Sequence, residues 1–388
     1  MGQLFLIIIT IITIICFAYI ILIASYCYAW IKIKSPIINP NVLKTLVTVI
    51  IAARNEEDNI ENCLTSILHQ SYPLENMEII VVDDASEDTT NSKIQQFCDT
   101  YKNIKLITLN KNSNLLGKKN ALNAAIKEAK GELIVTTDAD CIMGNNWLSI
   151  MVSYYKESQA KMIVAPVCFY NEKTVFEKMQ SLEFMALMLS TGASLYFNKA
   201  IMCNGANLAY SKKVFYDVGG FEDIDQQPSG DDVLLMYKIA EKYPAGIQFL
   251  KHREAIVYTK AKSTVSEFIN QRKRWASKGF NVLNGETKLV SLIVYLFNTL
   301  LLIIAVISPF YFENQVFHLS LFKICLILLG IKCLFDFLLL FLSTSFFKKK
   351  RFLIYFLPEQ ILYIAYIMMI GLLGSIGKYE WKNRNINR

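Results

Sequence analysis

The sequence predicts an α/β domain, with a mixed, mainly parallel sheet and helices on both faces, held between membrane-spanning segments. Runs of Val and Ile alternate with helical patterns between residues 45 and 288, which is typical of a parallel sheet covered on both faces. Long uncharged stretches flank this region. We therefore expect an N-terminal transmembrane anchor over 1–34, a globular domain over 45–288, a membrane region of two to three spans over 289–376, and a basic tail over 377–388.

The N-terminal stretch Leu4 to Ala24 has 21 residues without a charge, enough at 1.5 Å per residue to cross a hydrocarbon core of about 30 Å. It is longer than a signal-peptide core and no basic residue precedes it, so we expect a retained anchor. The other apolar stretches are Leu289 to Phe312, Val316 to Phe347 and Phe352 to Ile376. The last carries Pro358 and Glu359 near its start, so whether it spans the membrane or is kinked, re-entrant or interfacial stays open.

Charge is distributed unevenly along the 388 residues, whose 40 Lys and Arg and 33 Asp and Glu give a net charge of +7. The flanks hold 13 basic and four acidic residues, whereas 45–288 holds 27 basic and 29 acidic ones. A nucleic-acid binder would concentrate basic charge in its folded domain, so we expect no nucleic-acid partner. Basic residues follow the first span at Lys32 and Lys34 and the third at 348–351, which predicts a multi-pass protein of the plasma or inner membrane with the domain in the cytoplasm.

Several common sites are excluded by missing motifs. The nine cysteines form no CxxC pair, so neither a zinc site nor a disulfide framework is expected. No GxGxxG follows the first strand and no GxxxxGK[ST] occurs, which disfavours a dinucleotide oxidoreductase and a P-loop NTPase. A diphosphate bound here would need carboxylates with a metal, helped by Lys or Arg, to neutralise it.

Two predicted strands end in pairs of aspartates. After a first strand at 46–52 and a helical pattern up to residue 68, the strand at 78–82 ends at Asp83 and Asp84. A third strand at 103–109 and a helix at 118–130 follow, and the strand at 133–137 ends at Asp138 and Asp140. Ligands of parallel sheets bind beyond the carboxyl ends of the strands, so both pairs fall where a ligand is expected.

The D-x-D formed by Asp138 and Asp140 can aim two carboxylates at one space, which suits a hard cation between protein and phosphate oxygens. The alternative to a cation site is that these two aspartates only cap a helix or form a turn. Crowded carboxylates at one mouth repel each other unless a cation or a hydrogen-bond donor compensates them.

Two further groups stand nearer the C-terminus. Asp231 and Asp232 precede a helical pattern, either as an N-cap or with one of them as a general base that takes a proton from a hydroxyl. Gln271, Arg274 and Trp275 lie shortly before the second apolar stretch. They belong either to an amphipathic juxtamembrane helix or to a site that binds a diphosphate and stacks on a sugar ring.

Taken in order, these residues resemble glycosyltransferase family 2 over about residues 46–280. Q-x-x-R-W is matched outright, while Gly230-Asp231-Asp232 stands where many members have T-E-D. The stretches that carry the resemblance are Ala53-Arg54-Asn55-Glu56, Val81-Val82-Asp83-Asp84, Gly117-Lys118-Lys119-Asn120-Ala121-Leu122-Asn123, Asp138-Ala139-Asp140, Asn204-Gly205-Ala206-Asn207, Gly219-Gly220-Phe221, Gly230-Asp231-Asp232 and Gln271 to Trp275.

The resemblance implies a GT-A fold and an inverting, metal-dependent transfer from a nucleotide-diphosphate sugar, with UDP as the nucleotide that it favours and Mg²⁺ or Mn²⁺ as the metal. Asp138 and Asp140 would hold the metal. The donor-binding residues implied are Asn55, Glu56, Asp83, Asp84, Lys118, Asp138 and Arg274.

On the acceptor side, the resemblance implies that Asp232 deprotonates the acceptor hydroxyl. Asp231 replaces the family's Glu, so either Asp231 or Asp232 is the base. Gln271 and Trp275 would face the acceptor, which is either a growing polysaccharide or a lipid-linked saccharide. An export subunit is a further possible partner. The competing class is a non-catalytic, nucleotide-sugar-binding membrane subunit of a polysaccharide assembly complex.

Overall fold

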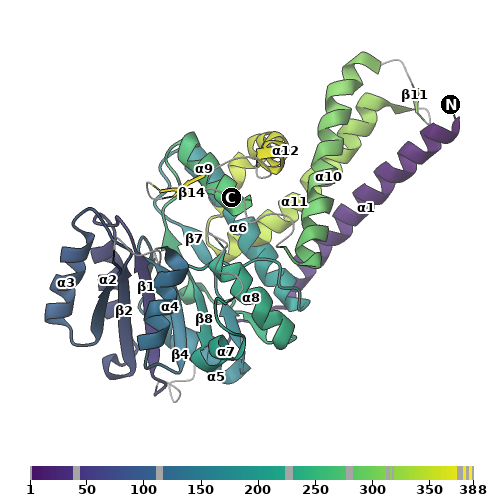
Figure 1. The fold of residues 1–388 in the computed structure, drawn as a ribbon. Helices are drawn as coiled ribbons and strands as arrows, with labels where there is room; N and C mark the ends of the chain where they lie inside the picture. The colour runs from purple at the N-terminus through teal and green to yellow at the C-terminus, as the bar shows by residue number, and fades with distance from the viewer. Residues whose placement is uncertain are drawn as a thin grey trace.

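The computed structural model describes residues 2–37, 44–110, 117–222, 230–276, 283–311, 315–316, 319–373, 379–381 and 384–386. An α/β domain lies at the lower left of Figure 1, and a long helical arm rises from it to the upper right. Of the predicted basic tail, only 379–381 and 384–386 are described, so Lys378, Lys382 and Arg388 lie outside the described residues.

The main sheet confirms the predicted fold class. Its order is β3-β2-β1-β4-β8-β6-β9, and the first four of these strands are mutually parallel. β8 is antiparallel to both of its neighbours, and β9 runs parallel to β6. The strands are β1 (Val47–Ala53), β2 (Met77–Asp83), β3 (Ile104–Thr108), β4 (Leu133–Asp138), β6 (Met162–Val164), β8 (Leu208–Ser211) and β9 (Ile247–Phe249).

Helices cover the sheet because each presents one apolar stripe to it. In α4 (Lys118–Glu128), for example, Ala121, Leu122, Ala125 and Ile126 are buried. The predicted helix continued to residue 130, but the chain turns extended at Ala129. The domain's other helices are α2 (Ile60–Leu68), α3 (Thr90–Thr100), α5 (Trp147–Ser158), α6 (Val175–Tyr196), α7 (Lys212–Asp217), α8 (Asp231–Lys242) and α9 (Val265–Ala276), with short turns η2 (Leu74–Asn76) and η3 (Arg253–Ala255).

A second, three-stranded sheet follows the D-x-D element. Its order is β5-β10-β7, with β5 (Ile142–Met143), β10 (Val257–Thr259) and β7 (Val167–Phe169). Two- and three-residue strands carry too little periodic pattern to be predicted from sequence. Two hairpins complete the described strands: β11 (Gln315–Val316) with β12 (Leu319–Ser320), and β13 (Tyr379–Trp381) with β14 (Arg384–Ile386).

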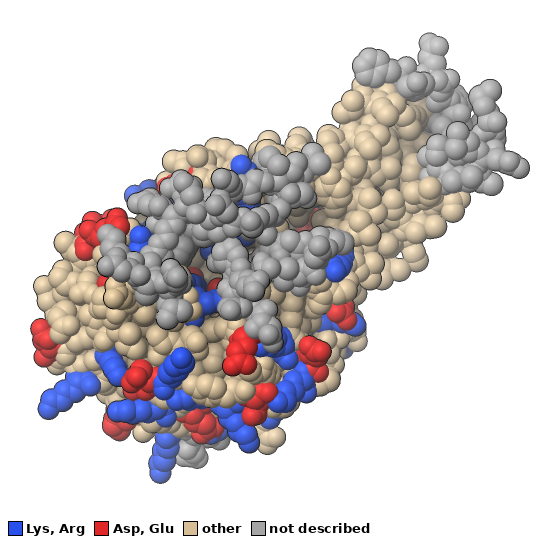
Figure 2. Space-filling model, viewed as in Figure 1, with Lys and Arg blue, Asp and Glu red and all other residues tan. Residues whose placement is uncertain are grey.

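Within the described ranges, four helical segments are long and apolar enough to cross a membrane. Three helices build the arm, α1 (Gly2–Lys32), α10 (Gly285–Ile307) and α11 (Leu321–Phe346). The arm's described surface is almost free of charge, whereas Lys, Arg, Asp and Glu cover the α/β domain (Figure 2). The turn η4 (Ser308–Tyr311) ends α10, and the turn η5 (Lys350–Tyr355) leads into α12 (Phe356–Leu373).

The first helix is longer than the uncharged stretch that predicts it. α1 continues to Lys32, and its last turns pack on the domain. There the ring of Trp30 lies 5.7 Å from that of Phe249 and 5.3 Å from that of Phe346 at the end of α11. Lys251 donates to the carbonyl oxygens of Trp30 and Ile33. The helix end is therefore part of the domain's core.

The fourth apolar segment runs in a different direction from the other three. α12 is seen nearly along its axis beside α9, while α1, α10 and α11 run obliquely up the arm (Figure 1). α12 contacts both α9 and α10. It therefore joins the base of the arm to the last helix of the α/β domain.

Asn207 ties the main sheet to the short one. It is fully buried, and its Nδ2 donates to the carbonyl oxygens of Pro166 and Ala255, each at 2.8 Å. Its Oδ1 accepts from the indole Nε1 of Trp147 at 2.9 Å. The last residue of the Asn204–Asn207 motif therefore has a structural part here, with each of its three hydrogen bonds satisfied inside the core.

We predict that Asn207→Ala lowers the free energy of unfolding by about 3 kcal/mol or more, because each buried group left without a partner costs roughly 1–3 kcal/mol. Thermal unfolding in detergent, followed by far-UV circular dichroism, measures this. Asn62→Ala on the exposed side of α2 is the matched control and should change stability by less than about 0.5 kcal/mol. Equal losses in the two variants would contradict the prediction.

Candidate active site

The loops that leave β1 and β2 are fastened to each other at the carboxyl edge of the sheet. Arg54 is buried, and its Nη1 donates to the carbonyl oxygens of Asp84 at 2.8 Å and of Ala85 at 2.6 Å. Asn55 has a left-handed φ of 50° and accepts from the backbone N–H of Glu87 at 2.9 Å. Arg54 thus binds the loop after β1 to the loop after β2, and the two loops form one surface.

Asn55 and Glu56, two of the predicted donor-binding residues, line a hollow of about 390 Å³ at this edge. Glu56 also accepts from the side-chain amide of Asn59 at 2.8 Å. The full lining is Asn55, Glu56, Glu57, Asp58, Asn59, Glu87 and Asp88. So many carboxylates repel a bare diphosphate.

Asp83 and Asp84 are both buried, and their carboxylates organise the loops around them. Asp83 accepts from the backbone N–H of Ser86 at 3.1 Å and from the side-chain amide of Asn91 at 2.9 Å. Asp84 Oδ1 accepts from the backbone N–H of Gly117 at 2.9 Å, directly before α4. The structure thus places the end of β2 against the start of α4, which carries Lys118.

Lys118 stands at the centre of the acidic groups. Its Nζ forms an ion pair with Asp138 Oδ1. Burial acts to lower its pKa, but the charges of Asp138, Asp231 and Asp232 outweigh burial and raise the Lys118 pKa above its usual range. A lysine pKa raised by folding stabilises the fold fully below about pH 10.4 and loses this effect only as the pH rises through the folded-state pKa. Lys118 is therefore a permanent cation at physiological pH.

Gly205 has no side chain and lies where Lys118 and the aspartates around it meet. Its backbone N–H donates to Asp232 Oδ2 at 3.0 Å, and its carbonyl accepts from Thr136 of β4 at 3.0 Å. A Cβ at Gly205 would lie 3.3 Å from Lys118 Nζ and 3.4 Å from Asp232 Cβ. The D-x-D strand, the start of α4, the 204–207 motif and the start of α8 therefore meet at one point.

Asp140 lies beside thiols that stay protonated. Its Oδ1 accepts from Cys141 Sγ at 3.5 Å. Burial and then the charges of Asp140 and Asp138 raise the pKa of the Cys141 thiol. Across the described ranges, no three His, Cys, Asp or Glu side chains form a metal-binding group.

The donor set nevertheless fits a divalent ion that arrives with its substrate. Mg²⁺ is usually held by one or two carboxylates together with substrate phosphates and water, without a cage made of protein alone. Asp140, with Asp138, supplies such carboxylates. Three carboxylates around Lys118 also exceed its single positive charge, which leaves the cluster negative and receptive to a cation.

Asp231 and Asp232 open α8, where the helix dipole stabilises negative charge. Asp232 also accepts from the backbone N–H of Val233 at 2.8 Å. Burial raises the pKa of the Tyr210 hydroxyl, and the nearby charge of Asp231 raises it further. Both carboxylates are near Lys118, and both stay candidates for the base.

The Q-x-x-R-W residues form a separate part of the structure. Gln271, Arg274 and Trp275 lie on α9, which contacts α12. The ring of Trp275 stacks 6.1 Å from that of Phe184 on α6. Residues 277–282, which follow α9, are outside the described part of the chain. The structure thus brings Lys118, Asp138, Asp231 and Asp232 together and ties α9 to α6 and α12.

Two residues near this helix were not predicted. Arg272 lies inside the Q-x-x-R-W stretch, and its Nη2 donates to Glu183 of α6 at 2.6 Å. The arginine could have been noticed as an extra cation within the motif. Glu183 has no such signal, because it stands in a helical stretch with no motif around it.

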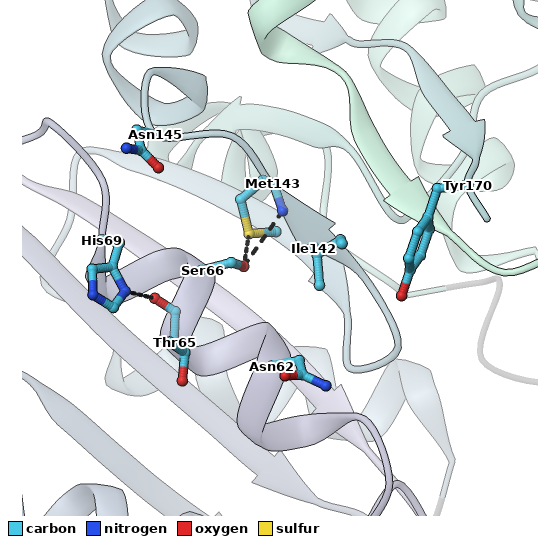
Figure 3. Close-up of a pocket in the computed structure, with 8 residues that line it drawn as sticks. All are labelled: Asn62, Thr65, Ser66, His69, Ile142, Met143, Asn145 and Tyr170. Atoms are coloured by element: carbon cyan, nitrogen blue, oxygen red, sulfur yellow. Dashed lines mark hydrogen bonds between the residues drawn. The ribbon is translucent and has the colours of Figure 1, made fainter.

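A larger hollow, of about 550 Å³, lies beyond the D-x-D element, between α2 and β5. Figure 3 shows Tyr170 across it from Asn62, with the Ser66 hydroxyl held by Met143. Its lining includes Ile142 and Met143 but none of the predicted site residues.

Comparison with known proteins agrees with this arrangement. Residues 48–219 match the family model "Glycosyl transferase family 2", which confirms the predicted resemblance for this segment. The chain is 27% identical over 238 residues to "Probable glycosyltransferase YdaM" of Bacillus subtilis, covering 59% of this chain and 54% of that protein. It is 26% identical over 259 residues to "Poly-beta-1,6-N-acetyl-D-glucosamine synthase" of Staphylococcus epidermidis, covering 65% of this chain and 60% of the synthase.

A solved structure extends the likeness of the fold to nearly the whole chain. The mannosyltransferase PcManGT from Pyrobaculum calidifontis, in complex with GDP-Man and Mn²⁺, superposes with a TM-score of 0.56 at 19% identity, covering 94% of this chain and 97% of that one. The predicted GT-A fold is confirmed.

We predict that Lys118→Met lowers the Tm by about 5 °C more than Lys105→Met does, because the carboxylates of Asp138, Asp231 and Asp232 lose the cation between them. Thermal unfolding in detergent at pH 7 measures this. Lys105→Met is the matched control, since Lys105 forms an exposed pair with Glu128. Equal Tm losses in the two variants would refute this account.

Proposed function

We propose that the protein is an inverting, metal-dependent glycosyltransferase that transfers a sugar from a nucleotide-diphosphate sugar to a hydroxyl of a polysaccharide or lipid-linked acceptor. The observation that carries the proposal is the cluster of Asp138, Asp231 and Asp232 around Lys118, at the carboxyl end of β4. A family 2 match over residues 48–219 supports the same reaction class.

The roles follow from where each group lies. The nucleoside occupies the hollow at Asn55 and Glu56, beside Asp83 and Asp84, and Asp138 lies near the ribose. Lys118 supplies permanent positive charge where the diphosphate departs, which is where negative charge develops in the transition state. When bound to Asp140 and Asp138, Mg²⁺ or Mn²⁺ would supply further positive charge to the diphosphate.

Inversion requires a base on the acceptor side of the anomeric carbon. Asp232, or its neighbour Asp231, takes the proton of the acceptor hydroxyl as that oxygen attacks in line. Gly205 holds Asp232 through its backbone N–H, so the base is oriented before the acceptor binds. The family 2 resemblance supports a place for Gln271 and Trp275 against the acceptor and for Arg274 against the departing diphosphate.

The relatives and the membrane segments support the proposed acceptor class. A poly-β-1,6-N-acetylglucosamine synthase among the relatives supports a growing polysaccharide, and four apolar helices support a reaction beside the bilayer. Basic residues after the first and third spans support a plasma or inner membrane protein with the domain in the cytoplasm. A non-catalytic nucleotide-sugar-binding subunit is the competing function.

The test is to incubate membranes containing the full chain with a panel of radiolabelled sugar nucleotides, with Mg²⁺, with Mn²⁺ or with EDTA. We expect label to pass from one donor into lipid extract or insoluble polymer, and EDTA to abolish this. Asp140→Ala should lose the metal-dependent part of nucleotide affinity. Donor binding without transfer to any product, in every condition, would favour the non-catalytic subunit.

We predict that Asp232→Asn lowers the transfer rate by about 10²–10⁴-fold, because the base is removed, while nucleotide affinity changes little. Asp231→Asn is the paired variant, and whichever of the two loses turnover is the base. Initial rates of label transfer, with nucleotide binding measured by calorimetry, separate the effects. Wild-type turnover in both variants would disprove a base at the start of α8.

A further inference from the structure

Arg272 is a buried cation on the helix that carries Gln271, Arg274 and Trp275. Only 2% of it is exposed, and its guanidinium lies 4.2 Å from the ring centroid of Trp275 and 4.7 Å from that of Phe268. Its Nη2 donates to Glu183 Oε2 at 2.6 Å, whereas Nε and Nη1 find no hydrogen-bond partner among the described residues. The carboxylate of Glu183 is therefore the anion that fixes this side chain.

Glu183 also meets α12. The Tyr366 hydroxyl lies against the Glu183 carboxylate, and the rings of Tyr366 and Phe268 are 5.5 Å apart. Glu183 itself stands on α6 and is 13% exposed. One carboxylate thus joins three helices: α6 of the domain, α9 with the Q-x-x-R-W residues, and α12 of the membrane region.

The same α12 is held to the arm by a second polar cluster. Lys332 of α11 is fully buried and pairs with Asp336 at 2.5 Å. It also donates to Gln360 of α12, and Asp336 accepts from the Tyr19 hydroxyl of α1 at 2.5 Å. Gln360 and Tyr366 are less than two turns apart, so polar contacts run from the arm across α12 to Glu183.

Buried ion pairs and hydrogen bonds of this kind hold their partners in one orientation. Removing one partner of a buried ion pair leaves an uncompensated charge, which then displaces its neighbours. The planar guanidinium of Arg272 stacks on aromatic rings such as that of Trp275, and Glu183 holds the guanidinium through the ion pair. Glu183 thus acts on the position of Trp275 through Arg272, beside the stacking of Trp275 on Phe184.

We propose that Glu183 is a positioning residue for the acceptor side of the site: it orients Trp275 through Arg272 and couples α9 through α12 to the arm. The proposal rests on the proposed function and deepens it. Loss of the Glu183 charge misplaces the acceptor relative to the donor, while the nucleotide site at β1, β2 and β4 keeps its geometry. Water then competes with the acceptor for the sugar.

The experiment uses the full chain in membranes, with the labelled donor that the panel selects and the acceptors those membranes contain. It measures the ratio of label transferred to label hydrolysed, and the affinity for that donor's nucleoside diphosphate. Glu183→Gln should lower the ratio about tenfold or more, with nucleotide affinity within about twofold of wild type. Tyr366→Phe, which keeps the ion pair, should lower the ratio less.

Glu172→Gln is the matched control. Glu172 is 4% exposed and pairs with Lys349, so it also joins the domain to the membrane region through a buried ion pair. It does not contact α9 in the described structure. Its ratio of transfer to hydrolysis should stay near that of wild type, even if its stability falls.

Three results would overturn the proposal. The first is an unchanged ratio in Glu183→Gln, the second an equal drop in Glu172→Gln, and the third a loss of nucleotide affinity in proportion to transfer. If Glu183→Gln does not fold, Tyr366→Phe decides, and an unchanged ratio there rejects the coupling. A wild-type chain that turns over no donor would instead reject the proposed function itself.

Discussion

One cation, the half-buried Lys118, holds the carboxyl edge of the sheet together. Asp138, Asp231 and Asp232 come from two elements far apart in sequence, and without Lys118 between them their charges would force these elements apart. Lys118 reaches them because Gly117, directly before α4, donates its backbone N–H to Asp84, directly after β2. The ends of three elements, β2, β4 and α8, therefore depend on where α4 starts.

The room around Gly205 constrains the site as much as the charges do. A Cβ at Gly205 would lie 3.3 Å from Lys118 Nζ and 3.4 Å from Asp232 Cβ, so a side chain there would make its neighbours give way by a few tenths of an ångström. Two residues later, Asn207 saturates its hydrogen bonds with Trp147, Pro166 and Ala255 and fixes the segment to the core. One short motif thus combines a rigid attachment with a close approach to the site.

The sequence predicted the parts of the fold whose pattern is local. β1, β2, β3 and β4 lie within about one residue of their predicted bounds, because Val and Ile runs identify buried strands. The aspartates at strand ends followed from the rule that ligands bind there. The short strands β5, β7 and β10 carry no such pattern. The pairing of Glu183 with Arg272 joins residues 89 positions apart, which no local rule can predict.

The fourth apolar segment illustrates that the sequence alone does not show what a charged residue within an apolar stretch does. Glu359 and Gln360 interrupt it, and both are buried by helix packing. Gln360 satisfies the otherwise costly Lys332 of α11, while Tyr366 faces Glu183 in the domain. The polar residues of α12 thus connect two layers of the protein. Because α9 lies against α12, the membrane helices also support the helix that carries the Q-x-x-R-W residues.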